Sequence, residues 1–188
     1  MGYLLRPDRR ASGRSGPLGM SRRRSVQILG AGQVALLVPL LVLERRMNRS
    51  GGPGIIPFEL AGTPERSRTI MKRWGSEGRS AARLSLLLDY PYLVTYSGLQ
   101  LAGCRAARRS LERRGHHRLA SAGRGIGSMQ LAAGAFDAAE NTALLGVLAG
   151  RDGRLPAIAR GCASAKFALL AVGWLYQGLG LASRLIKH

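Results

Sequence analysis

Four apolar stretches, each long enough to cross a lipid bilayer, dominate this sequence of 188 residues. A membrane-spanning helix needs about 20 mostly apolar residues, because the hydrocarbon core is about 30 Å thick and a helix rises about 1.5 Å per residue. The shortest stretch has 18 residues, which as a helix would span about 27 Å. We therefore predict an all-α fold, an integral membrane bundle of four transmembrane helices at about residues 26–43, 82–104, 126–149 and 158–185.

The chain is strongly basic, with 29 Lys and Arg residues against 10 Asp and Glu. Such a balance first suggests a nucleic-acid-binding protein. The Arg residues, however, gather in short clusters beside the apolar stretches, as in Arg22–Arg24 and residues 105–114, which is typical of the cytoplasmic loops of membrane proteins. We predict a multi-pass protein of the cell membrane that does not bind nucleic acid. A soluble helical domain with buried helices is the alternative.

The segments outside the apolar stretches are of two kinds. Residues 1–25 are basic, lack periodicity and are rich in Gly, Ser and Pro up to residue 20, so we expect them to be disordered, with Met20 as an alternative start. Residues 64–74 form a short amphipathic pattern, with Thr63 as N-cap and Pro64 at the first helical position. We predict that 64–74 is an interfacial helix and that 105–124 is a basic loop. Counting basic residues on each side places both termini in the cytoplasm.

Ionisable residues lie inside three of the apolar stretches, where a charge is costly and usually marks function. Asp89, Asp137, Glu140 and Lys166 fall at similar depths in the outer half of the predicted bundle, and Asn141 follows directly after Glu140. One interpretation is structural, with Lys166 paired to one acid and the others bonded to Asn141, Thr142, Tyr90 or Thr95. The other leaves one carboxyl without a partner and able to exchange a proton. We favour the second, because three acids outnumber one base.

Several further residues complete the candidate site. Tyr96 and Trp174 lie deep enough to line a pocket, and we assign them to substrate binding with Asn141, Lys166 and Glu59. Glu59 and Trp74 belong to a segment, 54–78, that could cover the site as a lid. The apolar stretches contain no His, which removes the usual ligands of a membrane haem. We therefore predict neither a metal nor a cofactor.

Three runs of the chain carry a resemblance: FELAGTPERSRTIMKRWG, SLLLDYPYLVTYSGLQLAGC and AFDAAENTALLGVLAG. Together they resemble uncharacterised small four-helix integral membrane proteins of high-GC, actinobacterial-type bacteria, over roughly residues 55–180. The resemblance implies four helices and no activity. The positions that it marks are Glu59, Glu65, Asp89, Asp137, Glu140 and Asn141.

Three functions are compatible with this pattern. The first is a lipid-phase enzyme in which Asp89, Asp137 or Glu140 acts as a general acid on an isoprenoid-like apolar substrate. The second is a proton-coupled carrier that uses Asp137 and Glu140 as a relay and works as a homodimer. The third is a non-catalytic accessory or assembly subunit. The partners expected are membrane lipid and, for the enzyme, an apolar small molecule.

Overall fold

The computed structural model describes residues 17–151 and 153–185, and within these ranges the protein is all-α. Five helices follow one another along the described chain, and no strand occurs among these residues. The helical part of the fold prediction is therefore confirmed. The helices are α1 (Pro17–Arg49), α2 (Ile55–Glu59), α3 (Pro64–Arg113), α4 (His117–Leu148) and α5 (Leu155–Leu185).

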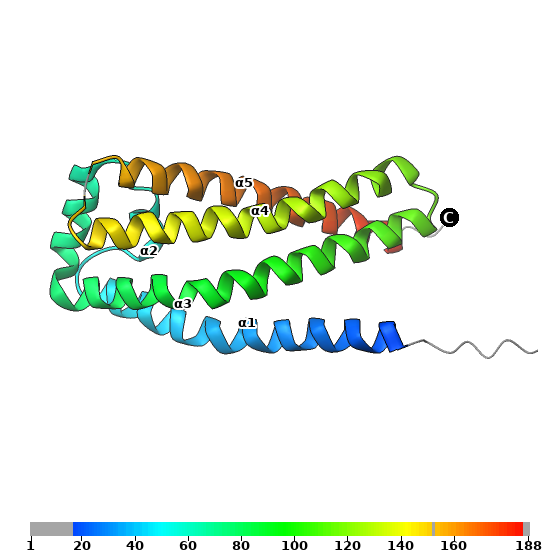
Figure 1. The fold of residues 1–188 in the computed structure, drawn as a ribbon, viewed down its shortest axis with the longest axis horizontal. Helices are drawn as coiled ribbons and strands as arrows, with labels where there is room; N and C mark the ends of the chain where they lie inside the picture. The colour runs from blue at the N-terminus through cyan, green and yellow to red at the C-terminus, as the bar shows by residue number, and fades with distance from the viewer. Residues whose placement is uncertain (1–16, 152, 186–188) are drawn as a thin grey trace, which may run out of the picture.

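Four long helices lie lengthwise beside one another (Figure 1). α3, α4 and α5 all pack against one another, whereas α1 packs chiefly against α3. The turn between α3 and α4 lies at the same end of the bundle as the first residues of α1 and the last residues of α5. α2, the first part of α3 and the α4–α5 connection lie at the opposite end, which we call the capped end.

The first part of α3 is an arm that crosses the capped end of the bundle (Figure 1). Thr63 is its N-cap, since its side chain accepts a hydrogen bond of 3.3 Å from the backbone N–H of Arg66, and Pro64 follows in the first turn. The helix breaks at Gly75, whose φ of 61° and ψ of −156° are not helical and suit glycine. The predicted N-cap is therefore confirmed, and the chain turns at Gly75 into the long part of α3.

Two predicted boundaries were wrong. Residues 17–25, predicted to be disordered, belong to α1, while residues 1–16 lie outside the described part of the chain. The predicted basic loop 105–124 is mostly helical, because α3 continues to Arg113 and α4 begins at His117. Arg, Ala and Leu are strong helix formers, so a basic composition does not end a helix. Gly115, with a φ of 78°, makes the short turn instead.

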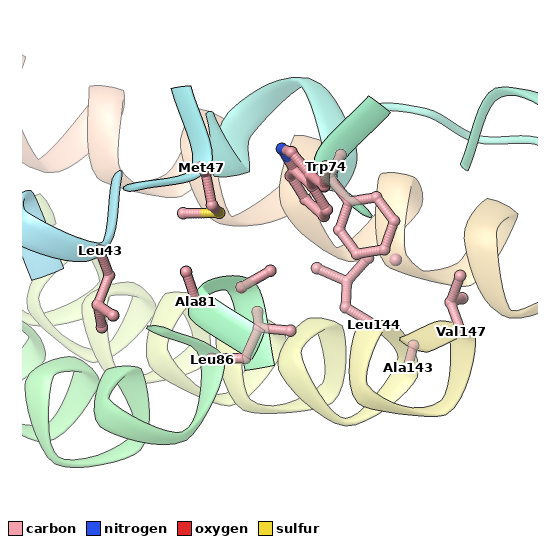
Figure 2. Close-up of a cluster of buried hydrophobic side chains, with 11 residues drawn as sticks. Leu43, Met47, Trp74, Ala81, Leu86, Ala143, Leu144 and Val147 are labelled. Atoms are coloured by element: carbon pink, nitrogen blue, oxygen red, sulfur yellow. The ribbon is translucent and has the colours of Figure 1, made fainter. Parts of the chain in front are cut away.

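Apolar side chains fill the two ends of the bundle. One cluster lies at the capped end (Figure 2), and it includes Leu43, Met47, Phe58, Trp74, Ala81, Leu86, Ala143, Leu144 and Val147. The other lies near the α3–α4 turn and contains Cys104, Ala107, Leu111, Ala120 and Tyr176. In α4 the buried residues between the two clusters include Gln130, Asp137, Glu140 and Asn141. A polar layer is therefore enclosed between two apolar layers.

Two of the five described helices are long and apolar enough to cross a membrane, α1 over Arg23–Arg49 and α5 over Leu155–Arg184. Only 6% of the apolar window of α1 and 28% of that of α5 is buried, so neither is a core helix of this bundle. These two helices agree with the membrane prediction. The four-span bundle is not confirmed by length and composition, because the polar residues of α3 and α4 lower their apolar character.

α3 and α5 approach so closely at Gly180 that a side chain has no room there. A Cβ atom at this position would lie 2.4 Å from the Cβ of Ala107 and 2.5 Å from its Cα. Gly178, two residues earlier on the same helix, is exposed and has nothing within 4 Å of the same added atom.

We expect Gly180→Ala to lower the stability of the protein by about 1–3 kcal/mol, because the backbone of α3 cannot move without disturbing the packing. Gly178→Ala is the matched control, and it should raise stability by up to about 1 kcal/mol through helix propensity alone. Thermal unfolding of the detergent-purified variants, followed by circular dichroism, makes the comparison. Equal melting temperatures for the two variants would contradict the close approach.

Candidate functional site

The centre of the polar layer is the ammonium group of Lys166, on α5. It lies 2.8 Å from Asp137 Oδ1 and 2.8 Å from Glu140 Oε2, both on α4. Glu59 Oε2, at the end of α2, is 3.7 Å away. All four residues are buried, with relative exposures between 0% and 8%. One cation therefore connects three acids that come from two other helices.

Helical spacing explains how α4 supplies so many of these groups. Residues three and four positions apart share one face of a helix, so Asp137, Glu140 and Asn141 all point inward. The Asn141 amide donates a hydrogen bond of 2.7 Å to Asp89 Oδ2, and the Tyr96 hydroxyl donates one of 2.7 Å to Asp137 Oδ2. Both oxygens of Asp137 are thus engaged, one by Lys166 and the other by Tyr96. α3 joins the cluster through these two bonds.

The cluster holds more acceptors than donors. Neither oxygen of Glu140, nor Oε2 of Glu59, accepts a well-directed hydrogen bond from the described residues, although all three atoms are buried. Burial raises the pKa of Glu59 above its ordinary value, and the positive charge of Lys166 opposes that rise. A proton held by one of the carboxyl groups would supply a missing donor and relieve the repulsion between like charges.

A cavity of about 480 Å³ lies beside this cluster. Its wall includes Asp89, Asp137 and Lys166, together with side chains from α1, α2 and α5. Phe167 and Trp174 also line it, and because they are 39% and 61% exposed, the cavity opens to the outside of the bundle along α5. A charged and hydrogen-bonded wall therefore faces a space that a molecule can enter from the side.

The structure brings most of the predicted site residues together. The cavity is lined by Asp89, Asp137, Tyr96, Trp174, Lys166 and Glu59. Asn141 does not line it but holds Asp89. Glu140 lies behind Lys166, is 0% exposed and does not line the cavity, so it is out of reach of a molecule bound there. Glu65, which the resemblance marks, is exposed on the arm of α3 and lies outside the site.

The contacts of the acids agree in part with the structural interpretation. Lys166 does pair with acids and Asn141 does bond to one, but Tyr90 bonds to Thr142 and Thr95 to Gln33 rather than to carboxylates. All four carboxyl groups have a neighbour in Lys166 or Asn141, so the predicted partnerless carboxyl is absent from the described residues. Asp89 comes nearest to it, since it lines the cavity and no described ion pair holds it.

Sequence reasoning missed the glutamines. Gln33, Gln100 and Gln177 line the cavity, where Gln33 accepts a hydrogen bond from Thr95 and Gln177 donates one to Gln100. Gln130 is fully buried and donates to the backbone carbonyl of Leu169. Each of the four apolar stretches carries at least one Gln, and the first carries two. This recurrence of Gln could have predicted polar contacts between the helices, because an amide inside an apolar helix needs an internal partner.

Within the described ranges, no group of three or more His, Cys, Asp or Glu residues is arranged to hold a metal ion. Comparisons with protein-family models, with curated proteins and with solved structures gave no match to this chain. The argument for function therefore starts from the geometry of the site.

We expect Lys166→Met to destabilise the protein by about 3–5 kcal/mol, because it leaves buried carboxyl groups without their counter-charge. Adding Glu140→Gln to this variant should restore part of the loss by removing one of the opposed charges. Arg154→Met, an exposed change near the start of α5, is the control and should change stability by less than about 0.5 kcal/mol. Denaturant titration in detergent measures all three. A Lys166→Met variant as stable as the control would contradict a central role for this cation.

Proposed function

We propose that this protein is a multi-pass membrane protein in which all four long helices cross the bilayer. The distribution of side chains supports this, because the middle of the interior holds Asp, Glu, Lys, Asn, Gln and Ser while many large apolar side chains face outward. Soluble proteins rarely expose wide apolar surfaces, whereas a bundle in lipid does so over its whole circumference. The outward-facing residues include Ile28, Val34 and Val38 on α1, Leu87 and Val94 on α3, Leu131 and Phe136 on α4, and Leu175 and Leu181 on α5.

Basic residues favour an orientation with both termini in the cytoplasm. The end with the α3–α4 turn carries Arg105, Arg108, Arg109, Arg113, Arg114, Arg118 and Arg124, and Arg23 and Arg24 lie at the same end on α1. Positive residues concentrate on the cytoplasmic side of multi-pass proteins. The capped end, with α2 and the arm of α3 at the interface, then faces outward.

Cysteine labelling tests this topology after Cys104 and Cys162 are replaced by Ala. We expect Ser76→Cys, on the exposed arm side, to react with an impermeant maleimide added to intact cells. Ser121→Cys, exposed near the start of α4, should react only after the cells are opened. Reaction of both cysteines from the same side would contradict four spans.

For the activity, we propose that the protein is a lipid-phase enzyme in which Asp89 acts as a general acid on an apolar substrate. The observation that carries this is the position of Asp89 in the wall of the laterally open cavity, while Lys166 holds the other carboxyl groups. In its protonated form, a carboxylic acid in the wall of the cavity can deliver a proton to a substrate bound there. Asn141 fixes the orientation of Asp89 through Oδ2.

The reaction class that fits is isomerisation of a carbon–carbon double bond. Asp89 gives its proton to one alkene carbon, and the positive charge develops on the neighbouring carbon. The rings of Tyr92, Tyr96 and Trp174 line the same cavity and can stabilise that charge. Loss of a proton from the next carbon to the Asp89 carboxylate forms the new double bond and restores the acid. The step is redox-neutral and needs no co-reactant.

The carrier and the accessory subunit receive less support from the same contacts. A relay through Asp137 and Glu140 needs carboxyl groups that can release their partner, but each lies 2.8 Å from Lys166. A purely structural cluster has no need of the cavity.

Deuterium exchange tests the proposal without knowledge of the substrate. Membranes that contain the protein are incubated in deuterated water, and the extracted lipids are analysed by mass spectrometry for deuterium bound to carbon. We expect Asp89→Asn to lower incorporation by about 10²–10⁴-fold, because the amide is no acid. The melting temperature should stay close to that of the wild type.

Glu77→Gln, an exposed change on α3 remote from the cavity, is the matched control and should leave incorporation unchanged. Incorporation that is absent from the wild type, or equal in Asp89→Asn, would rule out acid catalysis. Loss of the fold in both Asp89→Asn and Asp89→Glu would assign the residue to packing.

A further inference from the structure

A second cavity, of about 660 Å³, lies between α1 and α3 toward the basic end of the bundle. Its apolar wall is formed by Val26, Leu99, Ala102 and Ala106, with Gln27 and Gly103 beside them. Two arginines, Arg23 on α1 and Arg109 on α3, complete its lining, and both are exposed. An apolar space with cations at its rim suits a molecule that has an anionic end and an apolar body.

The two cavities adjoin each other. Leu99 lines both, so the cavity beside Asp89 and the cavity beside Arg109 meet at this side chain. Asp89 and Arg109 are 20 residues apart on one helix, which corresponds to about 30 Å. This distance is close to the thickness of the hydrocarbon core. The two adjoining cavities, which we together call the α1–α3 groove, therefore extend from the acid site in the outer half to the basic end.

The chemistry of the groove changes along its length. Guanidinium groups bind phosphate oxygens through paired, charge-assisted hydrogen bonds, so the basic end suits a phosphate. The middle is apolar at Val26, Leu99, Ala102 and Ala106 and suits a hydrocarbon chain. The far end carries Asp89 and the rings that line the first cavity. A soluble phosphate compound would leave the middle and far end empty.

We propose that the α1–α3 groove binds a lipid with one long unsaturated chain and a phosphate headgroup, which is the substrate class of the enzyme. The phosphate lies between Arg23 and Arg109, and the chain passes Leu99 to bring a double bond to Asp89. This inference rests on the proposed function for its double bond. The headgroup site rests on the arginines and can be tested by itself.

Native mass spectrometry of the detergent-purified protein tests the headgroup site. The probes are a long-chain polyprenyl phosphate, the polyprenyl alcohol of equal chain length, phosphatidylglycerol and inorganic phosphate. We expect the polyprenyl phosphate to bind at least about tenfold more tightly than the alcohol, because a charge-assisted hydrogen bond contributes enough for that ratio. The double variant Arg23→Gln, Arg109→Gln should lose this preference.

Arg118→Gln, Arg124→Gln is the matched control, since both arginines are exposed at the same end of the bundle but do not line the groove. It should keep the preference. Equal loss in both double variants would overturn the site in favour of general attraction to the basic end. Phosphatidylglycerol binding as tightly as the polyprenyl phosphate would overturn the single-chain class. If inorganic phosphate at the same concentration displaced the polyprenyl phosphate, the proposal that the ligand is a lipid would be overturned.

Asp89→Asn separates this inference from the proposed function. The variant should bind the polyprenyl phosphate as the wild type does, because its change lies at the far end of the groove. Normal binding of the polyprenyl phosphate with no deuterium exchange in the wild type would support the headgroup site and overturn the proposed enzyme activity. Deuterium exchange that depends on Asp89, without any preference for the polyprenyl phosphate over the alcohol, would support the proposed enzyme activity and overturn this substrate class.

Discussion

The buried ammonium group of Lys166 is the interaction on which the rest of the bundle depends. It contacts two carboxyl groups of α4 and lies 3.7 Å from Glu59 at the end of α2. Through Tyr96, which bonds to Asp137, the same cluster reaches α3. Taking charges out of water is costly, and the cost is recovered only when every partner is in place. The Lys166 cluster therefore fixes the relative positions of α2, α3, α4 and α5.

The polar layer also explains why the bundle is not closed. Small and polar side chains fill the interior at this level, while the larger apolar clusters lie toward the two ends. α1 packs chiefly against α3, so α1 and α5 do not meet in an extended interface, and the space beside α3 remains open. The groove is a consequence of this packing. Asp89 lines the groove because it lies on α3, which forms one side of it.

At the capped end, a few direct contacts hold α2 over the site. Glu44, near the end of α1, accepts a hydrogen bond of 2.9 Å from the backbone N–H of Ile55 and so caps the first turn of α2. Gly54 leaves room for this contact, since an added Cβ would overlap the Glu44 carboxylate and displace it. Phe58 and Trp74 then pack with ring centroids 4.9 Å apart, and Glu59 is directed to Lys166. α2 therefore covers the cluster through these hydrogen-bond and ring contacts.

The sequence by itself determined the helices and the inward direction of the acids. Apolar length gives the helical stretches, and a spacing of three or four residues places Asp137, Glu140 and Asn141 on one face. It also identified Thr63 as a cap, because that chemistry is local. It misplaced the loop at 105–124, since helix propensity continues where apolar character stops.

Only the tertiary structure decided which acid meets which partner. A pattern along one helix cannot fix the rotation and depth of its neighbours, so the sequence could not separate Glu140, behind Lys166, from Asp89, in the cavity wall. The glutamines of the groove were missed for the same reason, because an amide acquires its role only from the helix it faces. The groove between α1 and α3 is likewise a property of packing, and no single segment encodes it.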